Sequence, residues 1–213
     1  FGVIKERKNI WETSGQVFSS AETSINQKKF PKGYSTIKNK GFIKKGDVVL
    51  DIGGGRFDNV LEDISNINAK GYIFDPFNRP KSYNDKTVNI VKDGGADVVM
   101  SNNVLNVIKE PENIIKIIEQ AENALKINKK AFFSVYSGDA TGVGKQTSKG
   151  FQRNEKLSTY VSKVEEVFGK GNVEIKNNLI IATKKTQKED LITPTTKDFL
   201  SWNELIDAAE GRI

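Results

Sequence analysis

Two acids and a run of glycines stand out because each follows a short apolar run. Asp51, Gly53, Gly54 and Gly55 belong to the stretch VVLDIGGGRFD, and Asp75 ends the next run, GYIFD, 24 residues after the first acid. Glycines after a strand let the backbone turn tightly and let a ligand approach it, and an acid at the next strand end can accept hydrogen bonds from both hydroxyls of a ribose. The pattern predicts a nucleoside-type cofactor at the carboxyl ends of the strands; glycines that serve packing alone are the alternative.

Other chemistries are excluded by what the chain lacks. No Gly-Lys-Ser/Thr follows the glycines, so the stretch is not a P-loop, and the complete GxGxxG fingerprint of dinucleotide-binding proteins is also missing. The 213 residues include no histidine and no cysteine, which rules out Ser-His-Asp triads, cysteine nucleophiles and zinc–thiolate sites within this chain. We expect no metal site. The absence of cysteine fits a cytoplasmic protein.

The elements that must position these residues alternate between strands and helices. Apolar runs rich in β-branched residues predict strands, and amphipathic periodicity predicts helices, the strongest being EPENIIKIIEQAENALK. The predicted strands are residues 48–52, 71–75, 96–103 and 130–137, with a hairpin within 172–185 hinged at Asn177-Asn178. This order predicts an α/β fold with a mostly parallel sheet, a C-terminal antiparallel hairpin and helices on both faces. PFNRPKSYND is expected to be a loop because it contains two prolines.

Three regions are expected along the chain. Residues 1–46 read as a polar, mostly helical segment, residues 47–185 as the core, and residues 186–213 as a linker followed by a short helix. The longest apolar runs are too short to span a membrane.

The motifs together resemble those of a known family. VVLDIGGGRFD, GYIFDPFNRP and ADVVMSNNVLNVIKEPENIIKIIEQAENALK look like successive motifs of class I S-adenosylmethionine-dependent methyltransferases, which have a Rossmann-like sheet. More narrowly, they resemble the methyltransferases associated with DNA phosphorothioation and related methyltransferases of phages and mobile elements. TSINQKKFPKGY and TGVGKQTSKGFQ are similar to the same group, so the resemblance covers roughly residues 23–184.

The resemblance implies S-adenosyl-L-methionine as the cofactor and a role for each matched position. The glycines and the first acid would shape the pocket for its methionine part, the second acid would bind the ribose, and the next two residues would line the adenine side. The implied cofactor-binding set is Asp51, Gly53, Gly54, Gly55, Asp75, Pro76, Phe77, Asn102 and Val104. The interval between Asp75 and Ala96 is short, so the usual third strand is expected to be reduced or absent, and Asp93 is only a candidate for the adenine-contacting acid.

The candidate catalytic residues are Asn102 and Asn103, at the end of the strand over residues 96–103. Either amide oxygen could accept a hydrogen bond from the N–H of an amine acceptor. The alternative is that these amides only cap a helix or shape a turn. The segment SNNVLN lacks the Pro-Pro-aromatic motif common in base amino-methyltransferases, which argues against assuming methylation of adenine N6 or cytosine N4.

A basic loop is the candidate substrate site. The net charge of +6 and a pI near 9.3 favour an anionic partner, although a solvated lysine-rich surface would give the same values. Residues 138–154 follow a strand on the expected active edge, and an N-terminal basic element precedes the core. The candidate substrate-binding residues are Lys145, Lys149, Phe151, Gln152 and Arg153, with Lys28, Lys29 and Lys32 as the second element. Lysine and arginine suit phosphates and phenylalanine can stack on a base, whereas Tyr136 and Phe151 could equally be core residues.

The leading interpretation is therefore a methyltransferase acting on nucleic acid, with DNA favoured over RNA. A methyltransferase of a small molecule, nucleotide or protein is the alternative within enzymes, because a fold does not fix the acceptor. A catalytically degenerate module that binds nucleic acid is the alternative from another class. A nicotinamide-dependent dehydrogenase would require the complete fingerprint that the chain lacks.

Overall fold

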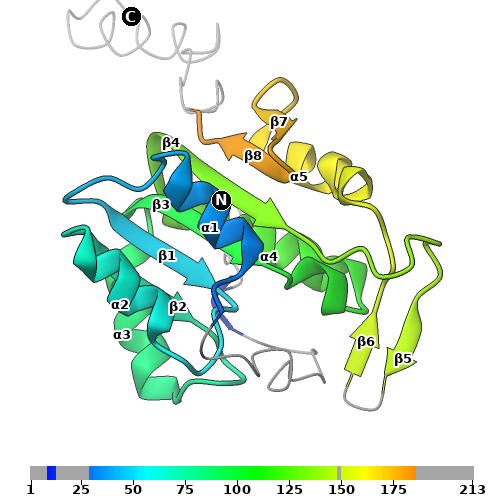
Figure 1. Ribbon diagram of the computed structural model, residues 1–213, viewed down its shortest axis with the longest axis horizontal. Coiled ribbons are helices and arrows are strands. Elements are labelled where there is room, and N and C mark those ends of the chain that lie inside the picture. Colours follow the sequence, from blue (N-terminus) through cyan, green and yellow to red (C-terminus); the bar gives the residue numbers. More distant parts are fainter. Residues whose placement is uncertain (1–8, 13–28, 148–149, 186–213) are drawn as a thin grey trace, which may run out of the picture.

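The computed structural model describes residues 9–12, 29–147 and 150–185, and its centre is a single mixed β-sheet (Figure 1). The described sheet has six strands, in the spatial order β2 (Lys70–Phe74), β1 (Val48–Ile52), β3 (Ala96–Asn102), β4 (Leu125–Ser134), β8 (Leu179–Thr183) and β7 (Val173–Lys176). The first four are parallel, whereas β8 pairs antiparallel with both β4 and β7. The predicted mostly parallel sheet with a C-terminal antiparallel hairpin is confirmed.

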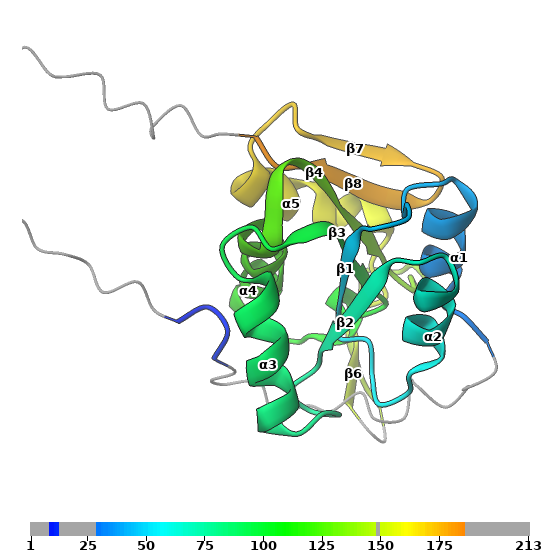
Figure 2. The same ribbon diagram turned by 90° about the vertical axis from the view of Figure 1, so that its left-hand side faces the viewer.

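Helices cover both faces of this sheet (Figure 2). One face carries α1 (Lys32–Asn39) and α2 (Asn59–Asn66); the other carries α3 (Lys81–Val91), α4 (Pro111–Ala124) and α5 (Val161–Phe168). Short 3₁₀ turns, η1 (Leu105–Val107) and η2 (Leu157–Tyr160), complete the connections. Because successive side chains of a strand point to opposite faces, each central strand feeds two separate cores. Val49 packs with the α1 and α2 side, whereas Leu50 packs with the α4 and α5 side.

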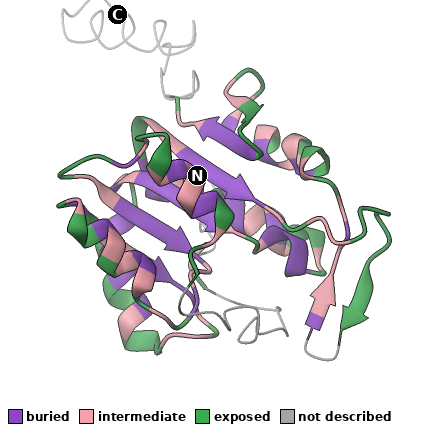
Figure 3. Cartoon of the chain, in the orientation of Figure 1, coloured by how far each residue is buried: buried purple, intermediate pink, exposed green. Residues whose placement is uncertain are grey.

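The central strands are the most buried part of the molecule (Figure 3). Val49 and Leu50 are fully buried, as are Val99 and Met100 on the neighbouring strand. Strands covered on both faces read as continuous apolar runs, which is why these segments could be found in the sequence. The parallel arrangement brings the carboxyl ends of β1, β2, β3 and β4 to one edge of the sheet.

The segment after β2 differs from its prediction as a loop. Only residues 76–80 form one, and α3 begins at Lys81 directly after Pro80. A proline fixes its own φ near the helical value and needs no N–H partner, so it suits a helix start as well as a loop. The prediction of a loop was wrong for residues 81–85, because Pro80 precedes the start of a helix and does not interrupt one.

The expected loss of the usual third strand is confirmed in the described chain: α3 connects β2 directly to β3, and no described strand lies outside β2. Residues 9–12 form a turn rather than the expected helix, with the Glu12 N–H donating to the Asn9 carbonyl over 3.1 Å. The Trp11 ring meets Phe74 edge to face at 5.0 Å, and its Nε1 donates to Asn123 Oδ1 over 3.2 Å. This aromatic contact packs residues 9–12 against the end of β2.

Two further expectations have definite outcomes. The predicted loop over residues 138–154 contains an antiparallel hairpin, β5 (Lys145–Thr147) and β6 (Gly150–Gln152). β4 begins at Leu125 rather than at residue 130. Lys28, Lys149 and the expected C-terminal helix lie outside the described residues. None of the helices in the described ranges has the length and apolarity needed to cross a membrane.

Candidate functional site

The glycine-rich turn after β1 lies at the carboxyl edge and is held close to its neighbours. Gly53 and Gly55 have φ angles of +76° and +78°, in the region that favours glycine. The Gly53 N–H donates to the Phe74 carbonyl over 2.8 Å. A Cβ on Gly53 would lie 2.5 Å from a methyl group of Val104, so the turn can approach the end of β3 only without a side chain there.

Asp51 lies beneath this turn in a dry environment. Its exposed fraction is 2%, and its Oδ1 has no hydrogen-bond partner among the described residues. A Cβ on Gly54 would lie 2.8 Å from Asp51 Oδ2, which shows how closely the backbone covers the carboxyl group. Burial, reinforced by the charge of Asp75, raises the pKa of Asp51 to about 8. An unpartnered buried oxygen at this edge is what a site for a polar or cationic ligand would leave.

Asp75 is equally buried but has the opposite hydrogen bonding. Its Oδ2 accepts from the Gly55 N–H and from Asn78 Nδ2, both over 2.9 Å. Its Oδ1 accepts from the backbone N–H groups of Phe77 and Asn78 over 3.1 and 3.0 Å. A carboxylate offers about four lone-pair positions, so this one is fully used. Ribose hydroxyls could bind it only by displacing one of these donors.

Two side chains that the sequence analysis missed hold the same loop. Arg79 donates from Nε to the Gly55 carbonyl over 2.8 Å and from Nη2 to the Phe57 carbonyl over 3.0 Å. Asn84 accepts from the Asp75 N–H over 2.8 Å and donates back to the Asp75 carbonyl over 3.2 Å. Arg79 lies within the motif GYIFDPFNRP, but its hydrogen bonds to the glycine turn are visible only in the folded structure.

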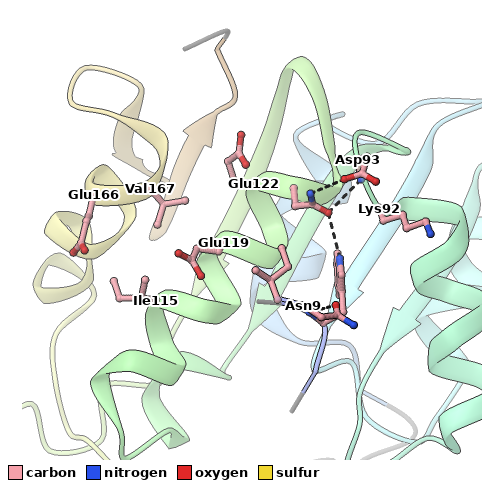
Figure 4. A pocket seen from close by; sticks show the side chains of 11 residues that line it. Asn9, Lys92, Asp93, Ile115, Glu119, Glu122, Glu166 and Val167 are labelled. Carbon is pink, nitrogen blue, oxygen red and sulfur yellow. Dashed lines mark hydrogen bonds between the residues drawn. The ribbon is translucent and has the colours of Figure 1, made fainter. Parts of the chain in front are cut away.

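Pro76 and Phe77 follow Asp75 at this edge, and the ring of Phe77 is exposed. Asp93 does not join them: it precedes β3 at the opposite edge of the sheet, where its Oδ1 accepts from Asn123 Nδ2 over 3.0 Å (Figure 4). The prediction that Asp93 is a candidate for contacting adenine was wrong. With the third strand absent, this acid lies before a strand instead of after one.

The two candidate catalytic amides differ in their freedom. Asn102 Oδ1 accepts from Ser134 Oγ over 2.9 Å, so the oxygen proposed to accept an amine proton already has a partner. Its Nδ2 is buried without a partner among the described residues. Asn103 is exposed and adopts a φ of +58°, with its N–H donating to the Ser134 carbonyl over 2.9 Å. Asn103 therefore has the freer side chain of the two.

The first turn of α1 packs directly on Asn102 and Ser134. A Cβ on Gly33 would overlap Asn102 Oδ1 and Ser134 Oγ, so glycine lets the helix approach the ends of β3 and β4. Of the segment before the core, the described helix α1 thus packs on the carboxyl edge of the sheet, and its Tyr34 and Ile37 are fully buried in the core on that face.

Two of the basic residues predicted for substrate form ion pairs. Arg153 forms a two-pronged ion pair with Glu155, over 3.0 and 2.9 Å, and its Nη1 donates to the carbonyls of Ile108 and Lys109. A phosphate would have to displace these partners, and the substrate role of Arg153 stays a prediction. Lys145 pairs with Asp139 over 2.9 Å but stays exposed, and Lys29 is exposed.

Gln152, predicted to contact substrate, forms hydrogen bonds within the protein. Its Nε2 donates to the Tyr136 carbonyl over 2.9 Å, and its Oε1 accepts from Asn106 Nδ2 over 3.1 Å. Asn106 also accepts from the Tyr136 N–H over 3.4 Å. These two amides fix the chain just beyond β4, where Tyr136 is 63% exposed and so is not a core residue. Phe151 is half-buried beside Lys109, whose Nζ lies 6.0 Å from the centre of its ring.

Comparison with known proteins connects this geometry to one fold. No family model matches the sequence, and no curated protein matches it. Among solved structures, 1,6-didemethyltoxoflavin-N1-methyltransferase from Burkholderia thailandensis, crystallised with its substrate and S-adenosylhomocysteine, superposes with a TM-score of 0.50 and 13% identity over 72% of this chain and 77% of that one.

Two further structures are similar at lower scores. An O-methyltransferase family protein from B. thailandensis gives a TM-score of 0.49 and 15% identity over 73% of this chain and 56% of its own. The 16S rRNA N2 G1207 methyltransferase of T. thermophilus gives 0.47 and 12% over 76% of this chain and 45% of its own. The matched region thus spans only about half the length of these two proteins. The chain has the Rossmann-like fold of class I methyltransferases, without their usual third strand among its described residues.

Proposed function

We propose that the protein is an S-adenosylmethionine-dependent methyltransferase whose acceptor is nucleic acid, DNA in preference to RNA. The observation that carries the first part is Asp51, which is buried under a glycine turn and has one carboxyl oxygen without a partner in the described part of the chain. The site residues we assign to the cofactor are Asp51, Gly53, Gly54, Gly55, Asp75, Pro76, Phe77, Asn102 and Val104.

The residues present fit such a cofactor. S-adenosylmethionine supplies an activated methyl group on a sulfonium, so the protein needs mainly to align the acceptor and exclude water. Gly53 and Gly54 let the turn pack against Val104 and over Asp51, where a Cβ would clash, so a bound cofactor would meet bare backbone at this turn. A cation bound over the turn favours the charged form of Asp51, which offsets the burial that otherwise keeps it protonated. Asp75 fixes the turn and offers the ribose an oxygen only in exchange for Asn78.

Charge and resemblance support the nucleic-acid acceptor. The chain carries a net charge of +6, and its motifs resemble methyltransferases associated with DNA phosphorothioation and with phages. Lys29, Lys32 and Lys109 replace Arg153 as the basic residues we assign to phosphate. Asn103 is the amide we assign to the acceptor amine. The cytoplasmic location expected from the composition stays a prediction.

A small-molecule acceptor is the second candidate. It is favoured by the ion pairs of Arg153 with Glu155 and of Lys145 with Asp139, which partly neutralise the charge of the predicted phosphate-binding loop. A catalytically degenerate binding module is the third candidate, and the methyl-transfer experiment described next tests it as well.

Calorimetric titration with S-adenosylmethionine, S-adenosylhomocysteine and NAD tests the cofactor. We expect stoichiometric binding of the two sulfur nucleosides and none of NAD; failure of both to bind would overturn the proposal. Transfer of a labelled methyl group to DNA, RNA or nucleotides then tests the acceptor. Cofactor binding without transfer to any of them would contradict the enzymatic part for nucleic acid.

A further inference from the structure

A hollow of about 600 Å³ adjoins Asn103 at the carboxyl edge of the sheet. Three segments that are distant in sequence line it: the first turn of α1, the residues just beyond β4, and the turn between β7 and β8. We call it the Tyr136 hollow, after the aromatic side chain in its wall. Its volume is in the range of small-ligand sites.

The lining of the Tyr136 hollow is polar and electropositive. Among the described residues that form it, none is acidic, and Lys32 contributes a positive charge. The first turn of α1 carries no acid and no side-chain cap, so the positive end of the helix dipole faces this edge uncovered. A ligand group with negative charge suits this lining, and a cationic ligand does not.

Two side chains hold the backbone of Tyr136, whose ring lines the hollow. Tyr136 is 63% exposed, yet Asn106 and Gln152 hold its backbone on both sides, through its N–H and its carbonyl. An exposed aromatic ring on a fixed backbone is costly to leave in water and is suited to stacking on a planar ring.

The floor leads toward the reacting edge. Ser134 and Asn103 line the hollow, and Ser134 donates to Asn102, whose Nδ2 is buried without a partner among the described residues. A ring stacked on Tyr136 would therefore lie in the same hollow as Asn103, the amide assigned above to the acceptor.

A second hollow of comparable size shows that this lining is specific. It has a volume of about 880 Å³ and lies on the α4 and α5 side, beside Trp11 (Figure 4). The described residues that line it include four acids and one basic residue: Asp93, Glu119, Glu122 and Glu166, with Lys92. Within the described residues these acids do not form a group able to hold a metal ion. Phosphate would be repelled there and attracted to the Tyr136 hollow.

We propose that the Tyr136 hollow binds one nucleotide unit of the methyl acceptor, with its base on Tyr136 and its phosphate on Lys32 and the first turn of α1. This inference rests on the proposed function and names the subsite for its acceptor. The nucleotide unit comes either from a nucleic-acid chain or from a free nucleotide, since both present the same ring and phosphate.

The test compares three probes on the full chain: a deoxynucleoside, its 5′-monophosphate and a short single-stranded oligodeoxynucleotide. Lys32→Ala should weaken binding of the monophosphate roughly tenfold, the scale of one charged hydrogen bond, and leave the nucleoside unchanged. Tyr136→Ala should weaken both at least about fivefold, whereas Tyr136→Phe, which keeps the ring, should not. Lys40→Ala, at the other end of α1, is the charge-matched control and should bind all probes as the parent does.

The source of the unit follows from the oligonucleotide. If Lys32→Ala and Tyr136→Ala also weaken the oligonucleotide, the hollow takes a unit of a nucleic-acid chain; if only the monophosphate is affected, it takes a free nucleotide. Equal effects of Lys32→Ala on nucleoside and monophosphate, or no effect of Tyr136→Ala, would overturn the proposal.

S-adenosylhomocysteine binding, measured in parallel, separates this inference from the proposed function. Binding of S-adenosylhomocysteine without binding of any nucleotide probe would sink the hollow alone. If the parent protein binds the nucleotide probes but does not bind S-adenosylhomocysteine, the proposed function is overturned instead.

Discussion

Asp51 lies near the end of β1, where it pairs with Ile73 of β2, and Asp75 directly follows β2. Each is 2% exposed, yet the protein hydrogen-bonds their carboxyl groups in opposite ways. Asp75 accepts four hydrogen bonds, three of them from the loop that it begins and one from Gly55. Asp51 has one oxygen with no described partner and a raised pKa. The difference indicates that a carboxylate at a strand end can serve either to build a loop or to wait for a ligand. The resemblance to a family assigned both to the ligand.

The largest expected effect concerns the pH dependence of stability caused by Asp51. Its folded pKa of about 8 lies above its unfolded value, so the folded protein binds more protons. Its contribution is therefore fully present below about pH 4 and is lost as pH rises through 8, by on the order of 3 to 5 kcal/mol. Asp51→Asn, which cannot ionise, should flatten this loss. Urea unfolding at pH 5 and pH 9 measures the free energy of unfolding of both proteins. If the parent and Asp51→Asn lose the same stability between these pH values, the carboxyl group is not shielded from water.

The second effect concerns Asp75. Asp75→Ala leaves the buried N–H of Gly55 and those of Phe77 and Asn78 without an acceptor, so unfolding free energy should fall by about 2 to 4 kcal/mol. Asp93→Asn, at the opposite edge, is the control and should change it by less than about 1 kcal/mol. Unchanged stability of Asp75→Ala would refute the loop-building role, and binding of S-adenosylhomocysteine as tight as in the parent would refute the ribose role.

Arg79 sharpens the comparison because it binds the same residue as Asp75 does: Gly55 donates its N–H to Asp75 and accepts at its carbonyl from Arg79 Nε. Arg79→Lys cannot reproduce the planar fork and should cost about 2 kcal/mol, measured by urea unfolding. Arg56→Lys, in the same turn but exposed, is the matched control. If both variants lose equal stability, the fork does not hold the turn.

The sequence was sufficient for the features that local pattern encodes. The strands β1 and β3 were predictable because continuous β-branched runs have few other uses, and the hairpin because Asn177 and Asn178 adopt positive φ angles readily. Partners in space were not predictable. The Asn106–Gln152 contact joins residues 46 apart, and Asn84 acts nine residues from its target. Glu155, two residues from Arg153, was the one available sign that this arginine pairs internally.

The smallest effect decides between the two uses of Asp75. Asn78→Ala removes only the side-chain donor to Asp75 Oδ2 and leaves the three backbone donors in place, so stability should fall by about 0.5 to 1 kcal/mol. It also frees one lone pair at the position that a ribose hydroxyl would need. If the ribose binds there, S-adenosylhomocysteine should bind Asn78→Ala as tightly as the parent or more tightly, because the ligand no longer competes with the amide. Weaker binding would mean that Asn78 itself contacts the ligand, and that Asp75, like Arg79, belongs to the loop rather than to the pocket.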